Sequence, residues 1–320
     1  MGRTAVIFPG QGAQVVGMGR DFVERSAAAR RTFEDANRIL GFDLADLCFS
    51  GPAERLNATD ISQPAIFVTS VAVWSAIQED SALAAEIRPD ASAGLSLGEY
   101  TALWLAEALS FEDALRLVNR RGQLMQRAAE ARPGGMVSVM GLNSDQIDQV
   151  VHEAACNDVL VASNFNAPGQ TVLSGDQVAC ERVPPIVERL GGRAAALRVA
   201  GAFHSPLMQS AAEELKTALA ATTVNAPRIP VAANVTGDYH EDPERIRALL
   251  YTQVARPIHW HASIERLIRD GIERFVEVGP GRVLTGLMRS IDRSVQAVNI
   301  STAQAMDKFR TAGAAAKGSD

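Results

Sequence analysis

The chain has 320 residues, of which 47% are hydrophobic and 21% charged, and its formal net charge is −6 at pH 7. That is the composition of an ordinary globular protein, long enough for one large core or two domains. The acidic balance argues against general nucleic-acid binding.

Cysteine usage and hydropathy restrict the class further. Three cysteines, an odd and sparse number, give no disulfide framework and suit a reducing cytoplasm. No His/Cys cluster has the spacing of a zinc site, and no stretch reaches the roughly 18 uninterrupted apolar residues of a membrane span. We therefore expect a cytoplasmic protein with no metal and no membrane segment.

The first 130 residues alternate short apolar strands with helices. The pattern predicts a buried strand over 4–8, a glycine-rich loop over 9–14, a strand over 90–94, and helices over 19–40, 65–78, 97–108 and 111–131. Pro64 is expected in the first turn of the 65–78 helix, where its missing N–H costs little.

The pattern changes after residue 133. Strands are predicted over 136–140, 159–165, 170–174 and 193–199, with helices over 144–155 and 176–190. Pro184 and Pro185 should interrupt the second helix or delay its start. The order βαββαβ is that of ferredoxin-like folds, so we interpret residues 131–199 as a small inserted domain.

The larger pattern resumes after Gly201 and completes the fold class, which is α/β. Strands are predicted over 231–234 and 274–278, with helices over 206–221, 243–253, 260–270 and 283–290. This alternation predicts a short, mostly parallel sheet covered on both faces, built from residues 1–130 and 200–310. The tail over 311–320 is rich in Ala, Gly, Lys and Ser and is expected to be disordered.

Gly94-Leu95-Ser96-Leu97-Gly98 is a G-x-S-x-G pentapeptide between a predicted strand and a predicted helix. This is the nucleophile elbow of α/β-hydrolase-like domains, in which glycines allow a sharp turn that exposes the serine hydroxyl. The same pentapeptide also marks purely structural turns. The strand–turn–helix context favours Ser96 as a nucleophile.

A nucleophilic serine needs a base, and the chain has five histidines. His204 is the best candidate because it lies in a loop before a predicted helix, in an apolar setting. His240 is expected to be solvated in a polar turn, and a structural histidine remains the alternative for His204. No acid lies in an obvious place between Ser96 and His204, so we expect a dyad, with the other imidazole nitrogen donating to a backbone carbonyl or a side-chain amide.

Two further features bear on a substrate. An arginine in the helix after the elbow could hold a carboxylate through two parallel hydrogen bonds, although the residues alone do not choose Arg121 over Arg120. The loop 9–14 lacks the phosphate-binding pattern but can present a backbone N–H to an oxyanion.

Taken together, the spaced motifs resemble those of malonyl-CoA:acyl carrier protein transacylases, a family that also includes polyketide acyltransferases. The match runs nearly end to end, through Phe8 to Gly12, Gln63 to Ala65, Gly94 to Gly98, Arg121-Gly122, Gly201 to His204 and Glu277 to Gly281.

The resemblance implies a role for each motif residue. Ser96 would carry the malonyl group as an ester, and His204 would be its base, oriented by the carbonyl or side chain of Gln253. Arg121 would clamp the malonyl carboxylate. The other implied substrate-binding residues are Gln11 and Leu97, whose N–H groups would form the oxyanion hole, Gln63, which would line the pocket, and Phe203, which would exclude an α-methyl branch.

The resemblance also implies substrates, partners and a mechanism. Malonyl-CoA would load Ser96, and the phosphopantetheine thiol of a holo-acyl carrier protein would then accept the malonyl group in a ping-pong reaction. No cofactor is implied, and a monomer is expected. Leu95 departs from the family, because most members carry histidine there, so a polar contact near the substrate is lost or replaced.

Two rival functions share these residues. A serine esterase or thioesterase would use the same elbow with water as acceptor, but it would be marked by an acid in a triad. A module that only binds carrier proteins would have lost the reactive residues. Because carrier proteins are usually acidic, a locally basic docking face is expected, with candidates Arg120, Arg127, Arg282, Arg289 and Arg293.

Overall fold

The computed structural model describes residues 2–317 and is built around two four-stranded sheets. The larger sheet has the order β2-β1-β7-β8 and is parallel throughout, which agrees with the prediction of a parallel sheet. Its strands are β1 (Arg3–Phe8), β2 (Ala91–Gly94), β7 (Ile272–Val278) and β8 (Gln296–Ile300).

Alternation along β1 places a core on each face of this sheet. Val6 and Phe8 point into one apolar cluster, while Ala5 and Ile7 point into another. The first cluster is covered mainly by the long helices, and the second by two C-terminal ones. The helices of the first face are α2 (Ala27–Leu40), α5 (Thr59–Glu79), α7 (Gly98–Leu105), α8 (Phe111–Ala131), α11 (Gln209–Ala221) and α12 (Pro243–Gln253), and those of the second are α13 (Trp260–Arg269) and α14 (Val283–Ile291).

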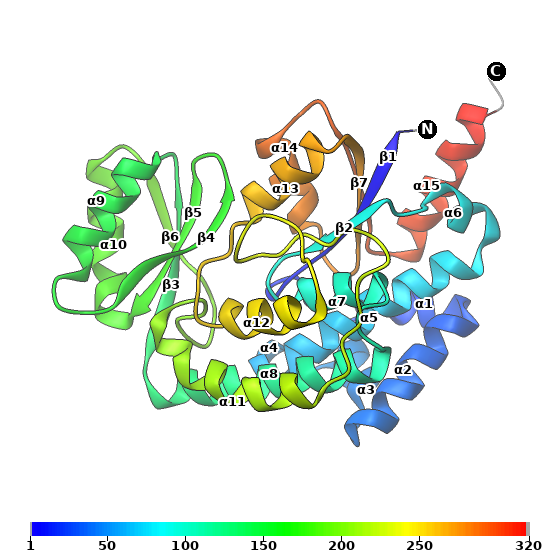
Figure 1. Ribbon diagram of the computed structural model, residues 1–320, viewed down its shortest axis with the longest axis horizontal. Coiled ribbons are helices and arrows are strands. Elements are labelled where there is room, and N and C mark those ends of the chain that lie inside the picture. Colours follow the sequence, from blue (N-terminus) through cyan, green and yellow to red (C-terminus); the bar gives the residue numbers. More distant parts are fainter. Residues whose placement is uncertain (1, 318–320) are drawn as a thin grey trace.

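The smaller sheet is antiparallel, with the order β4-β5-β3-β6. Its elements follow one another as βαββαβ: β3 (Gly134–Met140), α9 (Ser144–Ala155), β4 (Leu160–Ala167), β5 (Gln170–Asp176), α10 (Gln177–Arg189) and β6 (Arg193–Ala196). Figure 1 shows this unit in green at one end of the molecule, away from both termini.

Backbone hydrogen bonds join the smaller sheet to the segment between α12 and α13. The N–H of Phe165 in β4 donates to the carbonyl of Ile258 over 2.9 Å, and the N–H of Ile258 donates to Ser163 over 2.8 Å. The segment between α12 and α13 therefore extends the edge of the smaller sheet.

Several boundaries differ from the sequence prediction. The helix expected over 19–40 is two helices, α1 (Arg20–Arg25) and α2, because Ser26 adopts an extended conformation and its side chain caps α2. Pro64 lies inside α5, not in its first turn, and α10 continues through Pro184 and Pro185. The segment 231–234 forms only isolated bridges to Ser92 and Tyr239. Short helices α3 (Leu44–Ser50), α4 (Ala53–Asn57) and α6 (Ser81–Glu86), and the turn η1 (Pro206–Met208), complete the described elements.

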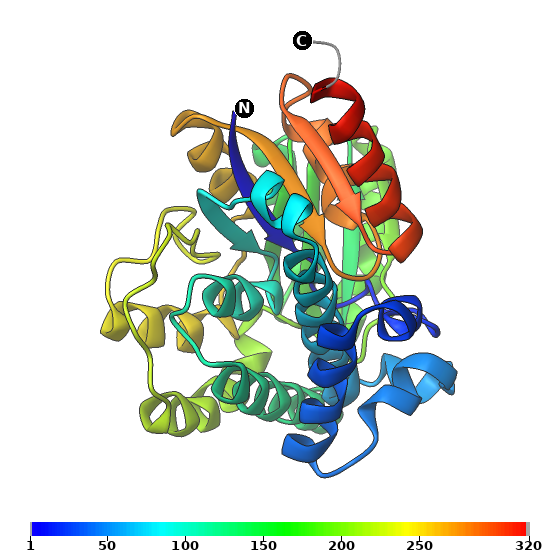
Figure 2. The same ribbon diagram turned by 90° about the vertical axis from the view of Figure 1, so that its right-hand side faces the viewer.

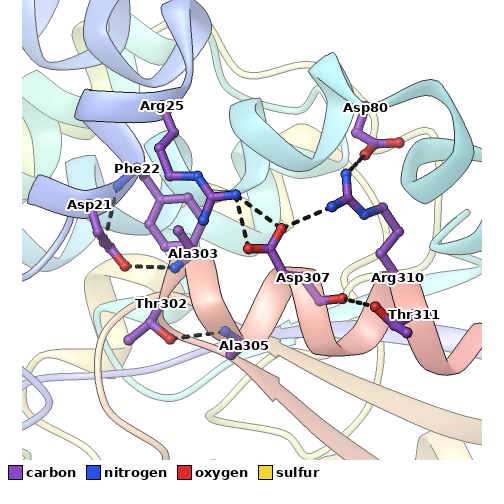
Figure 3. A network of polar contacts seen from close by, with 10 residues as sticks. All are labelled: Asp21, Phe22, Arg25, Asp80, Thr302, Ala303, Ala305, Asp307, Arg310 and Thr311. Atoms are coloured by element: carbon purple, nitrogen blue, oxygen red, sulfur yellow. Dashed lines mark hydrogen bonds and ion pairs between the residues drawn. The ribbon is translucent and has the colours of Figure 1, made fainter.

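The C-terminal segment was expected to be disordered from Thr311, but helix α15 runs from Ala303 to Lys317. Residues 318–320 of that prediction lie outside the described part of the chain. Figure 2 shows α15 in red beside strand β8. Its first turn is held by Asp21, whose carboxylate accepts from the N–H of Ala303 over 2.6 Å, and Asp307 pairs with Arg25 and Arg310 (Figure 3).

By length and hydropathy, α5 is the one helix of the described residues that could cross a membrane. However, 89% of its most apolar window is buried inside the protein. The helix is therefore explained by its position in the core.

Candidate active site

Ser96 occupies the sharp turn between β2 and α7, with a positive φ of 53°. A side chain on Gly94 would lie 1.9 Å from the backbone of Gly98, and one on Gly98 would lie 2.3 Å from the carbonyl of Phe8. Both positions therefore need glycine for close packing. The Ser96 N–H donates to the side-chain oxygen of Asn234 over 2.6 Å, which holds the turn in place.

Ser96 and His204 form a hydrogen-bonded dyad. The Ser96 Oγ lies 2.7 Å from His204 Nε2, and His204 Nδ1 lies 2.7 Å from the main-chain carbonyl of Gln253. Because a carbonyl only accepts, Nδ1 carries the proton and Nε2 is free to accept from the serine. Burial, and next the charge of Arg121, lower the pKa of His204 from 6.5 to about 3, so the imidazole is neutral near pH 7.

Arg121 lies on the buried face of α8 and is 1% exposed. It donates to Gln63 Oε1 over 2.7 Å, to Ser96 Oγ over 3.0 Å and to Gln253 Oε1 over 2.9 Å. No carboxylate among the described residues forms an ion pair with it. The buried carboxylate of Glu99 acts on Arg121 only at longer range, through the side chain of Gln253, so a direct carboxylate partner would have to arrive with a ligand.

Two backbone N–H groups are available beside the serine. Leu97 is the N-cap residue of α7, at the end where the helix dipole favours negative charge. The loop that carries Gln11 packs against the elbow, since a side chain on Gly10 would lie 2.5 Å from the carbonyl of Leu95. Neither the Gln11 nor the Leu97 N–H has an acceptor among the described residues, so both can meet an oxyanion.

The remaining predicted residues occupy different environments. Gln63 is fully buried and holds Arg121, which makes it a support of the guanidinium. Phe203 is also buried, in the larger apolar cluster, and its carbonyl accepts from the Ser174 hydroxyl of β5 over 2.7 Å. Leu95 is partly buried and packs against the second apolar cluster.

Sequence reasoning missed three residues around the dyad. Asn234 joins the elbow twice, because its amide also donates to the carbonyl of Gly94 over 2.8 Å. Glu99 is fully buried in α7 and accepts from Gln253 Nε2 over 2.6 Å. His240 was expected in a solvated turn, which is wrong: it is 6% exposed and lies 2.7 Å from Glu99.

The expected basic patch divides into two parts. Arg120 and Arg127 both pair with Glu214, at 3.4 and 2.8 Å, so one carboxylate offsets part of their positive charge. The other three arginines are exposed on or beside α14 and form no ion pair within the described chain; they are Arg282, Arg289 and Arg293. We call these three the α14 arginines. Helix α14 borders the smaller sheet, where Gln170 donates to Ser290 over 3.2 Å.

No group of three or more His, Cys, Asp or Glu side chains within residues 2–317 has the arrangement of a metal site. The groups that the site itself offers are a serine nucleophile, a neutral imidazole base, two free N–H groups and a buried guanidinium.

Comparison with known proteins places this geometry in context. Residues 5–317 match the family model described as an acyl transferase domain. The malonyl CoA-acyl carrier protein transacylase of Bacillus subtilis is 38% identical over 96% of this chain and 96% of its own length. The crystal structure of the transacylase of that name from Clostridium perfringens superposes with a TM-score of 0.92, at 34% identity and 98% coverage of both chains. A malonyl-transacylase solved in complex with its type II PKS acyl-carrier protein superposes with a TM-score of 0.90, at 36% identity over 96% of this chain and 98% of that one.

Proposed function

The chain belongs to the acyl transferase domain family, and from that premise we propose that it transfers a malonyl group from malonyl-CoA to the phosphopantetheine thiol of a holo-acyl carrier protein. The observation that carries the proposal is the buried guanidinium of Arg121, hydrogen-bonded to the Ser96 hydroxyl and without a carboxylate of its own. A malonyl group brings a carboxylate on the same short acyl chain that Ser96 attacks. The clamp and the nucleophile therefore fit one substrate.

The first half-reaction loads the serine. His204 Nε2 takes the Ser96 proton as Oγ attacks the thioester carbonyl, and the N–H groups of Gln11 and Leu97 stabilise the resulting oxyanion. The C–S bond then breaks, and coenzyme A leaves with the proton from His204. The malonyl group remains as an ester on Ser96 with its carboxylate on Arg121.

The second half-reaction is the reverse with a different thiol. The phosphopantetheine thiol gives its proton to His204 and its sulfur attacks the ester. The C–O bond breaks, and Ser96 recovers its proton from His204. No water is consumed, and the carboxylate stays paired with Arg121 through both steps.

The hydrogen-bond acceptor of His204 Nδ1 favours a transferase with a Ser–His dyad over a hydrolase with a catalytic triad. Its Nδ1 donates to the neutral carbonyl of Gln253, whereas a triad would place a carboxylate there. The histidine is therefore oriented without an adjacent negative charge, which supports the dyad and the transferase.

Carrier docking is proposed at the α14 arginines. They are exposed cations beside the smaller sheet, and an acidic carrier would meet charges that no neighbour in the described chain has neutralised. A monomeric, cytoplasmic enzyme without a cofactor completes the proposal; light scattering would check the monomer.

The decisive experiment is intact-protein mass after brief mixing with malonyl-CoA, and again after addition of holo-carrier protein. A malonyl adduct that needs Ser96 and moves to the carrier is the expected result. An adduct that decays to malonate at the same rate without carrier would favour a hydrolase instead.

A further inference from the structure

A buried carboxylate and a buried imidazole lie behind the dyad and take no part in the reaction described above. The side chains of Glu99 and His240 are both fully buried, with 2.7 Å between Oε1 and Nε2. The other oxygen of Glu99 accepts from the N–H of Asn234 over 3.3 Å and from Gln253 Nε2 over 2.6 Å. Burying a carboxylate costs free energy even when it is paired. The burial of Glu99 next to Gln253 therefore suggests a functional role for it.

Gln253 is the hub of the site. Its main-chain carbonyl accepts from His204, and its side-chain oxygen accepts from Arg121. Its NH2 group donates to the carbonyl of Ser96 over 2.9 Å and to Glu99. This one residue therefore contacts the base, the clamp and the nucleophile.

The carboxamide of Gln253 has two orientations of nearly equal shape, related by exchange of its oxygen and nitrogen. In the observed orientation, NH2 faces two acceptors and Oε1 faces a donor. In the exchanged one, Oε1 would face the oxygens of Glu99 and Ser96, and NH2 would face the guanidinium of Arg121. The carboxylate of Glu99 is the side-chain acceptor that selects the first orientation.

We propose that Glu99 is a positioning residue for acyl transfer, which orients the Gln253 carboxamide so that its oxygen faces Arg121. This inference rests on the proposed function and deepens it. His240 in turn holds Glu99 through a hydrogen bond. It lies in the loop that leads from Val231, which pairs with Ser92 of β2, to helix α12. The orientation of the Gln253 carboxamide thus determines whether Arg121 is held in place to bind the carboxylate of the substrate.

The expected signature is a change in selectivity rather than in stability alone. Glu99→Ala removes one of the two acceptors of the Gln253 NH2 group, so the carboxamide is held less firmly in the orientation whose oxygen faces Arg121. We expect acylation by malonyl-CoA to fall by at least about tenfold, since small displacements of catalytic groups cost up to about a hundredfold. Acylation by acetyl-CoA, which has no carboxylate to clamp, should fall less. Glu99→Gln keeps an acceptor oxygen for Gln253 and should restore most of the malonyl preference.

The test is single-turnover acylation of Ser96, followed by intact mass, with malonyl-CoA and acetyl-CoA in parallel. The matched control is Glu277→Gln, another fully buried carboxylate, whose oxygens accept from Leu284 and Thr285 at the start of α14. That variant should leave the malonyl-to-acetyl ratio unchanged. A thermal melt of every variant verifies that each one is folded at the temperature of the assay.

A double-mutant cycle isolates the path through Gln253. In a Gln253→Ala background, Glu99→Ala should add no further loss, because its target is gone. A loss of the same size in both backgrounds, or an unchanged malonyl-to-acetyl ratio in Glu99→Ala, overturns the inference. If Glu99→Ala does not fold, Glu99→Asp withdraws the acceptor while keeping the charge, and an unchanged ratio there overturns it equally.

Failure of the proposed function would look different. Wild-type protein would then take no malonyl group, whereas labelling of Ser96 by a fluorophosphonate probe would still report on the dyad. This probe has no carboxylate to clamp, so Glu99→Ala should be labelled at close to the wild-type rate. Labelling slowed as much as malonyl transfer would show that Glu99 supports the dyad and not the clamp, which would contradict the inference.

Discussion

Arg121 donates to the hydroxyl of Ser96 over 3.0 Å, so the cation touches the nucleophile before any substrate is present. The serine oxygen accepts from the guanidinium and donates to His204 at the same time. One side chain therefore stands where it can orient the nucleophile and bind the far end of a malonyl group.

Replacement of Arg121 by Ala should change which acyl group is used. We expect malonyl-CoA acylation to fall by about a hundredfold, in line with the several kcal/mol that a buried charge pair contributes. Acetyl-CoA should be affected much less. The matched control is Arg120→Ala, one residue away but half-exposed and paired with Glu214. Equal losses for both acyl groups in Arg121→Ala would contradict the clamp.

The lowered pKa of His204 predicts a flat pH profile. With a pKa of about 3 in the folded protein, the base is neutral throughout the range from pH 5 to 8, so acylation of Ser96 should not decline near pH 6.5 as it would for an ordinary histidine. Rapid-quench acylation at several pH values measures this. A midpoint close to 6.5 would show that burial does not hold the imidazole neutral.

The same pKa predicts how stability depends on pH. Because the folded-state pKa lies below the unfolded value of 6.5, the unfolded chain binds more protons between these values. The contribution of His204 to the free energy of unfolding is thus complete above pH 6.5 and is lost as pH falls toward 3. Urea melts of wild type and His204→Gln should differ in slope against pH in that window; parallel curves would refute the assignment.

Transfer to the carrier should depend on salt through the α14 arginines. Changing Arg282, Arg289 and Arg293 to Gln should slow transfer to the carrier by about tenfold at low ionic strength and flatten its salt dependence. Loading from malonyl-CoA measures whether the site itself is intact and should change little. Arg120 and Arg127, already paired with Glu214, provide the control pair for the same substitution.

Two aspartates that hold α15 should differ in their effect on stability (Figure 3). Asp21 accepts from the N–H groups of Phe22 and Ala303, so Asp21→Ala should cost about 1 kcal/mol, like the loss of a helix cap. Asp307 makes partly exposed ion pairs, so Asp307→Ala should cost less than about 0.5 kcal/mol. Thermal melts decide the order, and neither change should alter acylation.

Local patterns in the sequence were enough to select Ser96 and His204, which lie within hydrogen-bond distance of each other in the structure. The elbow is a local strand–turn–helix signal, and its glycines are needed for contacts of under 3 Å that only glycine permits. Helix periodicity also distinguishes Arg121 from Arg120 as the buried arginine. Arg121 lies on the same buried face of α8 as four apolar residues, Leu117, Val118, Leu124 and Met125.

The rest depended on contacts between distant segments. Glu99 and His240 are 141 positions apart, and neither has a local pattern that distinguishes it from a solvated charge. Similarly, Val231 to Asn234 has the composition of a strand, yet it pairs only through isolated bridges while Asn234 braces the elbow. Tertiary context decides such cases, and a single sequence does not display it.

The hydrogen bond from Ser174 to the carbonyl of Phe203 has a consequence for engineering the protein. It ties the smaller sheet to the residue next to His204, whose Nε2 lies 2.7 Å from Ser96 Oγ. A linker joining Ala131 to Gly201 would leave the parallel sheet whole but free that carbonyl. The inserted unit is thus not a detachable module, and chimeras of this enzyme must exchange it together with the Phe203-His204 junction.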